Sequence, residues 1–367
     1  MSRKGFYLPS LIVSSIRAIR LTCLPHIGKG LSALLIICGG YAFANNEPLR
    51  TETVRIDSAV PEFKLALHHE FAAQSDNTRK RIVLFAEGSA VPTAGNAAFK
   101  IGGLSWMDDL AEHGFDVWSL DYLGTGDSSR YPESKTGGPP GRASDCAEQL
   151  AEAARYILKK EKVEKLTVIG DSFGSLVAGI FATRTPELLD KLVLVAPVTP
   201  AAQPKPMQAS QVPNYDFDTV DDFWQIYSSW LPKGEFTGVN QDFFLRDWGP
   251  KYLDGDPESR HRNPPSVMVP SGPAVDMAEV SAGRFVYDPA KINVPTLIIF
   301  GEWDAIATEE GGKRLFDLLT GTQRKSLVII GRGTHLPQFE SVRFELYRNI
   351  RTFLEIDDPD MVDSARY

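Results

Sequence analysis

The chain has 367 residues, of which 43% are apolar and 23% are charged, and this balance excludes a disordered protein and favours a globular one with a sizeable core. A chain of this length could form one large α/β domain or two ordinary ones. Residues 1–44 hold five of its 39 basic side chains and no acidic one, so the remainder carries 34 basic and 47 acidic groups, a net charge of −13. Such an acidic body, with no Lys/Arg cluster, lacks the cations that bind nucleic acid.

Residues 1–44 have the character of a targeting segment. The apolar stretch 31–38 follows basic residues and is short for a bilayer span, and Ala42, Phe43 and Ala44 then fit a signal-peptidase site. We expect cleavage after Ala44 and a secreted or periplasmic protein with no stable membrane span. The long basic region and the acid-free, Arg- and Ser-containing composition leave a retained membrane anchor and an organellar presequence as alternatives.

Beyond the leader, the predicted strands and helices alternate from residue 81 onward. Alternation of this kind predicts a doubly wound, mostly parallel α/β sheet, and apolar runs such as 192–196 suit parallel strands that are covered on both faces. The expected elements in chain order are a hairpin of strands 51–57 and 63–71, strand 81–85, helix 97–113, strand 116–120, helix 144–160, strand 166–169, helix 173–184, strand 191–196, strand 296–300, helix 308–319, strand 325–330 and helix 339–354.

The alternation stops between the sixth and seventh strands. Residues 197–290 are rich in proline and aromatic residues and contain helical patches but no strand pattern. We interpret them as a helical cap over a substrate pocket, with Trp224 and Tyr227 as pocket candidates; the alternative is an ordinary helical excursion packed on the sheet. The chain then divides into a leader (1–44), the first part of the core (45–196), the cap (197–290) and the second part of the core (291–367).

A serine lies between two glycines where strand 166–169 gives way to the following helix, as Gly170, Asp171, Ser172, Phe173 and Gly174. This is the pattern of a nucleophile elbow. The turn is so tight that the serine takes a strained conformation and side chains at the glycine positions would collide with neighbouring backbone. The five-residue pattern arises by chance in roughly one chain in ten of this length, so its context must support it.

A serine nucleophile needs a base, and the base needs an orienting acid. Asp304 lies in the loop after strand 296–300, and His335 lies in the loop after strand 325–330, at the strand ends where α/β sheets place their active sites. We expect His335 to take the proton of Ser172 and Asp304 to orient the imidazole. Glu302, two residues before Asp304, is the alternative acid.

The order of serine, acid and histidine, together with the turn 121–128, resembles a capped member of the α/β-hydrolase superfamily, in the branch of lipases and esterases, epoxide hydrolases and proline iminopeptidases. The turn matches the family pattern Asp-x-x-Gly-x-Gly-x-Ser. The resemblance runs from about Thr51 to the last helix. It implies an α/β-hydrolase fold with the cap between the sixth and seventh strands. Asp171 and Asp127 are expected to stabilise the elbow and this turn.

The chain departs from the family after its third strand, where the family usually has His-Gly and this sequence has Glu87 and Gly88. The resemblance implies an oxyanion hole built from the backbone N–H groups of Ser89 and Phe173, and such donors do not require the histidine. Glu87 either pairs with a cation or a backbone donor beneath the loop or contacts a basic or hydroxylated substrate. A carboxylate so close would disfavour anionic substrates.

These residues predict a serine hydrolase that cleaves an ester, lactone or thioester through an acyl-enzyme, and the aromatic cap suggests a substrate with an apolar moiety. A serine nucleophile counts against dehalogenase and epoxide hydrolase chemistry, in which a carboxylate attacks. Acyl transfer to an alcohol, amide hydrolysis of the iminopeptidase kind and a non-catalytic binding role remain alternatives.

No cofactor or metal is expected. The sequence has no CxxC or HExxH motif, and His68 and His69 are adjacent in a predicted strand, where their side chains point to opposite faces. Once the leader is removed, Cys146 is the only cysteine, so no intrachain disulfide can form. We expect Cys146 to be a small buried apolar residue.

Overall fold

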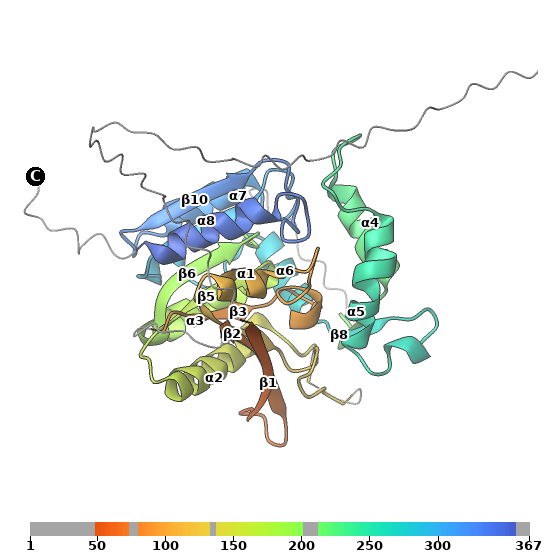
Figure 1. Cartoon of the computed structure of the whole chain (residues 1–367), viewed down its shortest axis with the longest axis horizontal. Helices are drawn as coiled ribbons and strands as arrows, with labels where there is room; N and C mark the ends of the chain where they lie inside the picture. Colours follow the sequence, from red (N-terminus) through yellow and green to blue (C-terminus); the bar gives the residue numbers. More distant parts are fainter. Residues whose placement is uncertain (1–47, 73–79, 133–136, 201–211, 357–367) are drawn as a thin grey trace, which may run out of the picture. The chain divides into compact units, whose positions relative to one another are not determined.

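The computed structural model describes residues 48–72, 80–132, 137–200 and 212–356 (Figure 1). The predicted leader, with its cleavage site after Ala44, lies outside these ranges. No helix in the described ranges is long and apolar enough to cross a membrane.

Eight strands form one sheet in the order β1-β2-β4-β3-β5-β6-β9-β10. The hairpin of β1 and β2 joins the edge of the sheet in antiparallel fashion, and the strands from β4 onward run parallel, as predicted. The bounds are β1 (Leu49–Asp57), β2 (Lys64–Ala72), β3 (Ile82–Ala86), β4 (Asp116–Asp121), β5 (Leu166–Asp171), β6 (Leu189–Val195), β9 (Thr296–Gly301) and β10 (Lys325–Ile330).

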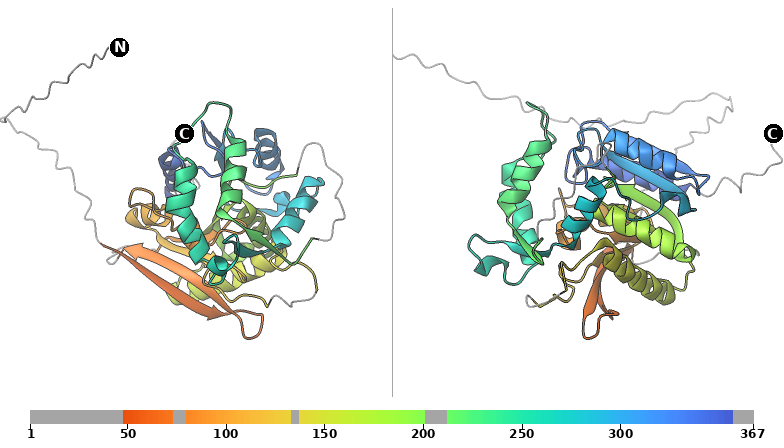
Figure 2. Two further views of the ribbon diagram at one scale, coloured as in Figure 1. Left: turned by 90° about the vertical axis from the view of Figure 1, so that its right-hand side faces the viewer. Right: turned by 180° about the vertical axis from the view of Figure 1, so that it is seen from behind.

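Helices cover both faces of this sheet (Figures 1 and 2). On one face α1 (Trp106–Glu112) contacts α8 (Arg343–Glu355), and on the other α2 (Ala143–Glu161) packs along α3 (Phe173–Arg184). The helix α7 (Glu309–Leu318) connects β9 to β10. The predicted doubly wound α/β architecture is therefore confirmed.

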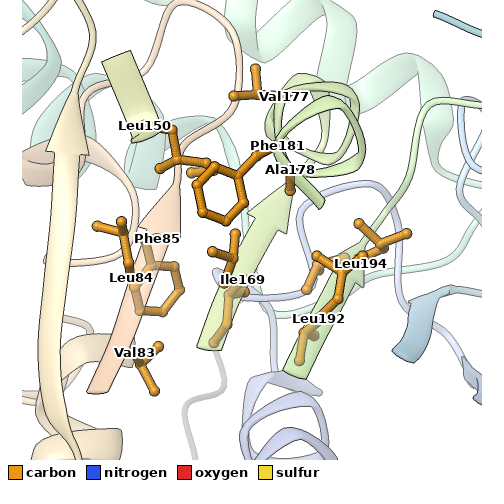
Figure 3. Close-up of a cluster of buried hydrophobic side chains, with 14 of the residues drawn as sticks. Val83, Leu84, Phe85, Leu150, Ile169, Val177, Ala178, Phe181, Leu192 and Leu194 are labelled. Atoms are coloured by element: carbon orange, nitrogen blue, oxygen red, sulfur yellow. The ribbon is translucent and has the colours of Figure 1, made fainter. Parts of the chain in front are cut away.

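The core lies between the central strands and their helices. Every residue of β3, β4, β5 and β9 is buried, as strands that are covered on both faces must be. Figure 3 shows Phe181 of α3 and Leu150 of α2 directed toward Phe85 of β3 and Ile169 of β5. Cys146, also on α2, is 2% exposed, which confirms its predicted place in the core.

Two predicted helices begin later than expected. The first, expected from residue 97, begins only at Trp106, because Gly102 and Gly103 adopt positive φ angles and Ser105 caps the helix through a capping box with Asp108. The last, expected from residue 339, begins at Arg343. The residues before it form a loop that carries side chains of the candidate active site.

The inserted segment, residues 212–295 between β6 and β9, corrects one expectation. It contains a two-stranded antiparallel sheet, which the sequence pattern did not indicate because each strand has only four residues and its partner lies about 50 residues away. Its elements are β7 (Tyr215–Asp218), α4 (Val220–Trp230), the π-helical turn Phe243–Trp248, α5 (Gly249–Asp254), β8 (Val267–Pro270) and α6 (Gly272–Ser281).

Aromatic side chains of the inserted segment build a second apolar cluster. Its fully buried members include Tyr227, Phe244, Trp248 and Tyr252, and the rings of Trp248 and Tyr252 stack with their centroids 4.7 Å apart. The helices α4 and α5 lie to one side of the main sheet (Figure 1). The cluster is separate from the core of the sheet and also includes Phe339, from the loop after β10.

Candidate active site

The carboxyl ends of the parallel strands bring the predicted site loops together. Ala86 pairs with Gly170, and Asp171 pairs with Val195, so the chain leaves β3, β5 and β6 at the same level of the sheet. The loops after β9 and β10 leave at the same edge. Open α/β sheets bind their ligands at this edge.

The turn at Ser172 is strained in the manner of a nucleophile elbow. Ser172 adopts φ 53° and ψ −119°, and its N–H donates to the carbonyl of Val195 at 2.9 Å. A Cβ atom on Gly174 would lie 1.9 Å from the carbonyl oxygen of Ala86, and one on Gly170 would lie 2.5 Å from the carbonyl oxygen of Gly174. Only glycine lets α3 begin so close to the sheet, with the serine at its amino end.

Three predicted side chains meet at this turn. The Nε2 atom of His335 lies 2.8 Å from Ser172 Oγ, and its Nδ1 atom lies 2.9 Å and 3.0 Å from the two carboxyl oxygens of Asp304. A carboxylate can only accept, so Nδ1 carries the ring proton and Nε2 is free to accept the proton of the serine hydroxyl. The arrangement has the geometry that an activated serine requires.

The acid that contacts His335 is Asp304 and not Glu302. Asp304 is 6% exposed, and its Oδ1 also accepts the backbone N–H groups of Ile306 and Ala307 at 2.8 Å each. Glu302 is exposed and accepts the N–H of Arg332 at 2.9 Å. The two backbone donors fix the Asp304 carboxylate, which in turn fixes the imidazole.

His335 is buried, with 3% of its surface exposed. Burial lowers its pKa, but the charge and the hydrogen bond of Asp304, with a further contribution from Asp171, outweigh burial, so the pKa of His335 is raised above its usual 6.5. Its ring and that of Trp230 of the inserted segment form an edge-to-face pair, with ring centroids 5.3 Å apart.

The predicted oxyanion donors are the backbone N–H groups of Phe173 and Ser89. Phe173 is the first residue of α3, so its N–H is among those that a helix leaves without an intrahelical acceptor. Ser89 belongs to residues 87–89 after β3, which we call the oxyanion loop after the role predicted for Ser89. The residue before it, Gly88, approaches Ser172 so closely that a Cβ atom on it would lie 3.5 Å from the serine Cβ.

Glu87 is the first residue of the oxyanion loop, and it is 1% exposed. Its Oε1 accepts the hydroxyl of Ser119 at 2.6 Å, and its Oε2 accepts the side-chain amide of Asn96 at 2.7 Å. Within the described ranges it forms no ion pair with a lysine or arginine. Of the two roles considered from the sequence, this placement is nearer to pairing beneath the loop, with a hydroxyl and an amide as the partners.

Tyr227 and Trp224 lie within the apolar cluster of the inserted segment. Tyr227 is fully buried, and its hydroxyl contacts the hydroxyl of Thr237 and donates to Glu340 at 3.0 Å. Glu340 in turn accepts both the N–H and the hydroxyl of Thr334, the residue before the histidine. Trp224 is half-buried, 6.2 Å from the ring of Tyr227. Tyr227 thus links the inserted segment to the loop of the histidine.

One group of side chains has the composition of a metal site. His68, Asp121 and Asp127 offer ligand atoms within 4.8 Å of one another. Several of these atoms are already engaged in hydrogen bonds within the protein. His68 Nε2 bonds to Asp121 at 2.9 Å, and Asp121 also accepts the N–H groups of Thr93 and Asp127. The group stabilises the turn after β4.

A model of the alpha/beta hydrolase fold family matches residues 93–342, more than half of the chain. The chain belongs to the α/β-hydrolase family. As a member of this family, the protein is a hydrolase. No curated protein matches the sequence.

Solved structures of other α/β-hydrolases share the fold at low sequence identity. A serine hydrolase involved in carbazole degradation (CarC) has a TM-score of 0.56 and 15% identity over 84% of this chain and 100% of its own. The 2-hydroxy-6-oxo-6-phenylhexa-2,4-dienoate hydrolase (BphD) of Rhodococcus sp. strain RHA1 has a TM-score of 0.56 and 19% identity over the same shares. A bacterial membrane phospholipase A has a TM-score of 0.54 and 18% identity over 84% of this chain and 86% of its own.

Sequence reasoning missed four side chains of this α/β-hydrolase that contact the site. Asn96 and Gln338 bond to each other beside the elbow, Glu340 holds the residue before the histidine, and Trp230 faces the imidazole. Asn96 lies nine residues after Glu87 and Trp230 lies in the inserted segment, and neither is part of a recognisable motif. Gln338 and Glu340 follow His335 closely, and their polar character just before a helix was the one signal in the sequence.

Proposed function

We propose that this α/β-hydrolase is a serine hydrolase that cleaves an ester, lactone or thioester through an acyl-enzyme. The observation that carries the proposal is the continuous hydrogen-bonded line from Ser172 Oγ through the imidazole of His335 to the carboxylate of Asp304, with contacts of 2.8 Å and 2.9 Å. A serine at a strained elbow with a base in reach is arranged for nucleophilic attack.

In the proposed first step, Ser172 Oγ attacks the substrate carbonyl while His335 Nε2 takes the hydroxyl proton. The carbonyl oxygen becomes an oxyanion that accepts from the N–H groups of Ser89 and Phe173. When the intermediate collapses, the imidazolium returns the proton to the leaving alcohol or thiol, and the acyl group stays on the serine. A water that loses its proton to His335 then releases the acid and restores the hydroxyl.

The charges around the site favour a neutral substrate. The groups with the largest electrostatic effects on His335, Asp171, Glu87 and Glu340 are carboxyl groups and His335 itself. An anionic substrate would meet this negative surrounding without a partner. The aromatic ring of Trp230 beside the imidazole supports an apolar moiety in the acyl or alcohol part.

Labelling with a fluorophosphonate tests the proposal directly, because such probes bond covalently to activated serines. We expect the wild type to label and to hydrolyse p-nitrophenyl esters, and Ser172→Ala to lose labelling and to lower kcat by about 10⁵-fold or more. Ser229→Ala, which alters an exposed serine on α4, is the matched control and should label normally. Hydrolysis that survives Ser172→Ala undiminished would refute the assigned nucleophile.

A further inference from the structure

One side chain, Asn96, contacts three of the loops that carry the proposed catalytic groups. Its Nδ2 donates to Glu87 Oε2 at 2.7 Å and to Asp171 Oδ2 at 2.9 Å, and its Oδ1 accepts from Gln338 Nε2 at 2.8 Å. Glu87 begins the oxyanion loop, Asp171 immediately precedes the nucleophile, and Gln338 lies three residues beyond the base. All four side chains are at most 5% exposed. Both hydrogens of the amide and its oxygen therefore have a partner, one in each loop.

The segment that bears this amide is itself fixed. The Thr93 hydroxyl bonds to that of Ser119 at 2.8 Å, and Ser119 donates to Glu87 Oε1 at 2.6 Å. Trp248 of the inserted segment donates from Nε1 to the carbonyl of Gly95 at 2.8 Å. Both oxygens of Glu87 are thus held, one by Asn96 and the other by a hydroxyl of the central sheet.

We propose that Glu87 and Asn96 are positioning residues that hold the oxyanion loop against the nucleophile elbow and the loop of the base. The proposal rests on the serine hydrolase function proposed above. The N–H of Ser89 follows Glu87 by two residues, so a shift of the Glu87 side chain moves that donor. A donor displaced by about 1 Å loses much of its effect on the transition state.

The hydrogen bonds around Asn96 accommodate one ionised carboxyl group better than two. Glu87 and Asp171 share the same NH₂ group, and within the described ranges neither forms an ion pair with a lysine or arginine. Burial raises the pKa of Glu87 to about 8 and that of Asp171 to about 6. At pH 7 Glu87 is therefore protonated, and its carboxyl group accepts the amide of Asn96 through Oε2 and the hydroxyl of Ser119 through Oε1.

Ionisation of Glu87 has a kinetic consequence. The titratable groups that face Glu87 are Asp171 from the elbow, Asp121 from the end of β4, His68 from β2 and Tyr122 from the turn after β4. Above pH 8 a second negative charge, that of Glu87, shares the Asn96 amide with Asp171 and lies in the loop of the predicted oxyanion donor. Both effects raise the barrier, so kcat falls as the pH rises through 8.

The test compares three variants of the full chain with a matched control. Glu87→Gln keeps the shape without the charge, Glu87→Ala leaves Asn96 and Ser119 without their acceptor, and Asn96→Asp replaces the shared donor by a third carboxyl. Glu70→Gln is the control, because Glu70 is 3% exposed, lies on β2, and has a pKa that burial also raises to about 8. Thermal unfolding of each variant shows whether it is folded at the assay temperature.

At pH 7 we expect Glu87→Ala and Asn96→Asp to lower kcat by about 10²-fold with little change in KM. Glu87→Gln should retain most of the wild-type kcat and lose the decline above pH 8, whereas Glu70→Gln should keep that decline. A Glu87→Gln variant as impaired as Glu87→Ala, or one with the alkaline decline of the wild type, would overturn the proposal.

A measurement without substrate separates this proposal from the proposed function. In protein labelled with ¹³C at the glutamate side-chain carboxyl, the signal missing from Glu87→Gln identifies Glu87. We expect it to titrate near pH 8 in the wild type and to move to higher pH in Ser119→Ala, which loses the hydroxyl that donates to the ionised carboxylate. Titration near 4.5 would overturn the proposal, whereas a wild type that neither labels with fluorophosphonate nor hydrolyses esters would refute the serine hydrolase function.

Discussion

The two sides of Ser172 bury carboxyl groups in different ways. On the base side, Asp304 accepts two backbone N–H groups and the imidazole of His335, so its charge has fixed donors and a partner that becomes a cation during the reaction. On the oxyanion side, Glu87 and Asp171 have an amide and a hydroxyl as neutral partners. Burying a charge is costly unless a partner compensates for it. The fold therefore keeps the negative charge of Asp304, where it would stabilise an imidazolium. It suppresses that of Glu87, where a negative charge would oppose an oxyanion.

Removal of the charge on the base side should have the largest effect. Asp304→Asn keeps the size of the side chain but allows its NH₂ group to face His335, which favours the ring tautomer with the proton on Nε2 and removes the acceptor for the serine proton. We expect kcat to fall about 10⁴-fold with KM changed much less. Steady-state kinetics on a p-nitrophenyl ester would measure both. Glu302→Gln, at the exposed acid of the same loop, should behave as wild type, and equal losses in the two variants would contradict the assignment of Asp304.

A change at the glycine between the two sides should destabilise the whole fold. A Cβ atom on Gly174 would lie 1.9 Å from the carbonyl oxygen of Ala86 and 2.6 Å from that of Glu87, and these are backbone atoms of the sheet edge that cannot move aside. We expect Gly174→Ala to lower the free energy of unfolding by more than about 3 kcal/mol, or to prevent folding. Urea denaturation followed by circular dichroism would measure the change.

The control for this variant is Gly331→Ala. The nearest atom to a Cβ on Gly331 lies 3.9 Å away, and this residue does not adopt a positive φ. Its free energy of unfolding should stay close to that of the wild type. A Gly174→Ala variant as stable as Gly331→Ala would show that α3 can begin further from β3 than the structure places it.

The sequence predicted the main sheet well because each of its strands and helices has a local signal. Apolar runs identify the buried strands, and the elbow helix begins and ends at Phe173 and Arg184, as expected. The short β7 and β8 were missed because their pairing depends on residues far apart in the chain. The helix expected from residue 97 began late because two glycines interrupt it, and a broad apolar pattern does not show such a break.

The residues of the site likewise divide into those with a local signal in the sequence and those without one. The elbow, Asp304 and His335 each follow a recognisable strand, so the chain order predicted which of them meet. Asn96 lies well beyond the end of β3, outside any motif, and its partners lie in three separate loops. Glu87 was noticed only because it replaces a usual histidine, and its neighbours were beyond reach of a single sequence. A side chain whose role depends on several distant partners leaves no local pattern.

The pH profile of hydrolysis should separate the two sides of Ser172. His335 acts as a base only when it is neutral, and its pKa is raised above its usual 6.5, so kcat/KM should fall tenfold per pH unit once the pH drops below that raised pKa. In Asp304→Asn the charge that outweighs burial is gone, so the acidic limb of the residual activity should move to lower pH while the alkaline limb stays. In Glu87→Gln the alkaline limb should be lost while the acidic limb stays. An acidic limb that keeps its midpoint in Asp304→Asn would mean that a group other than His335 titrates there, and that the carboxylate on the base side does not set the protonation of the base.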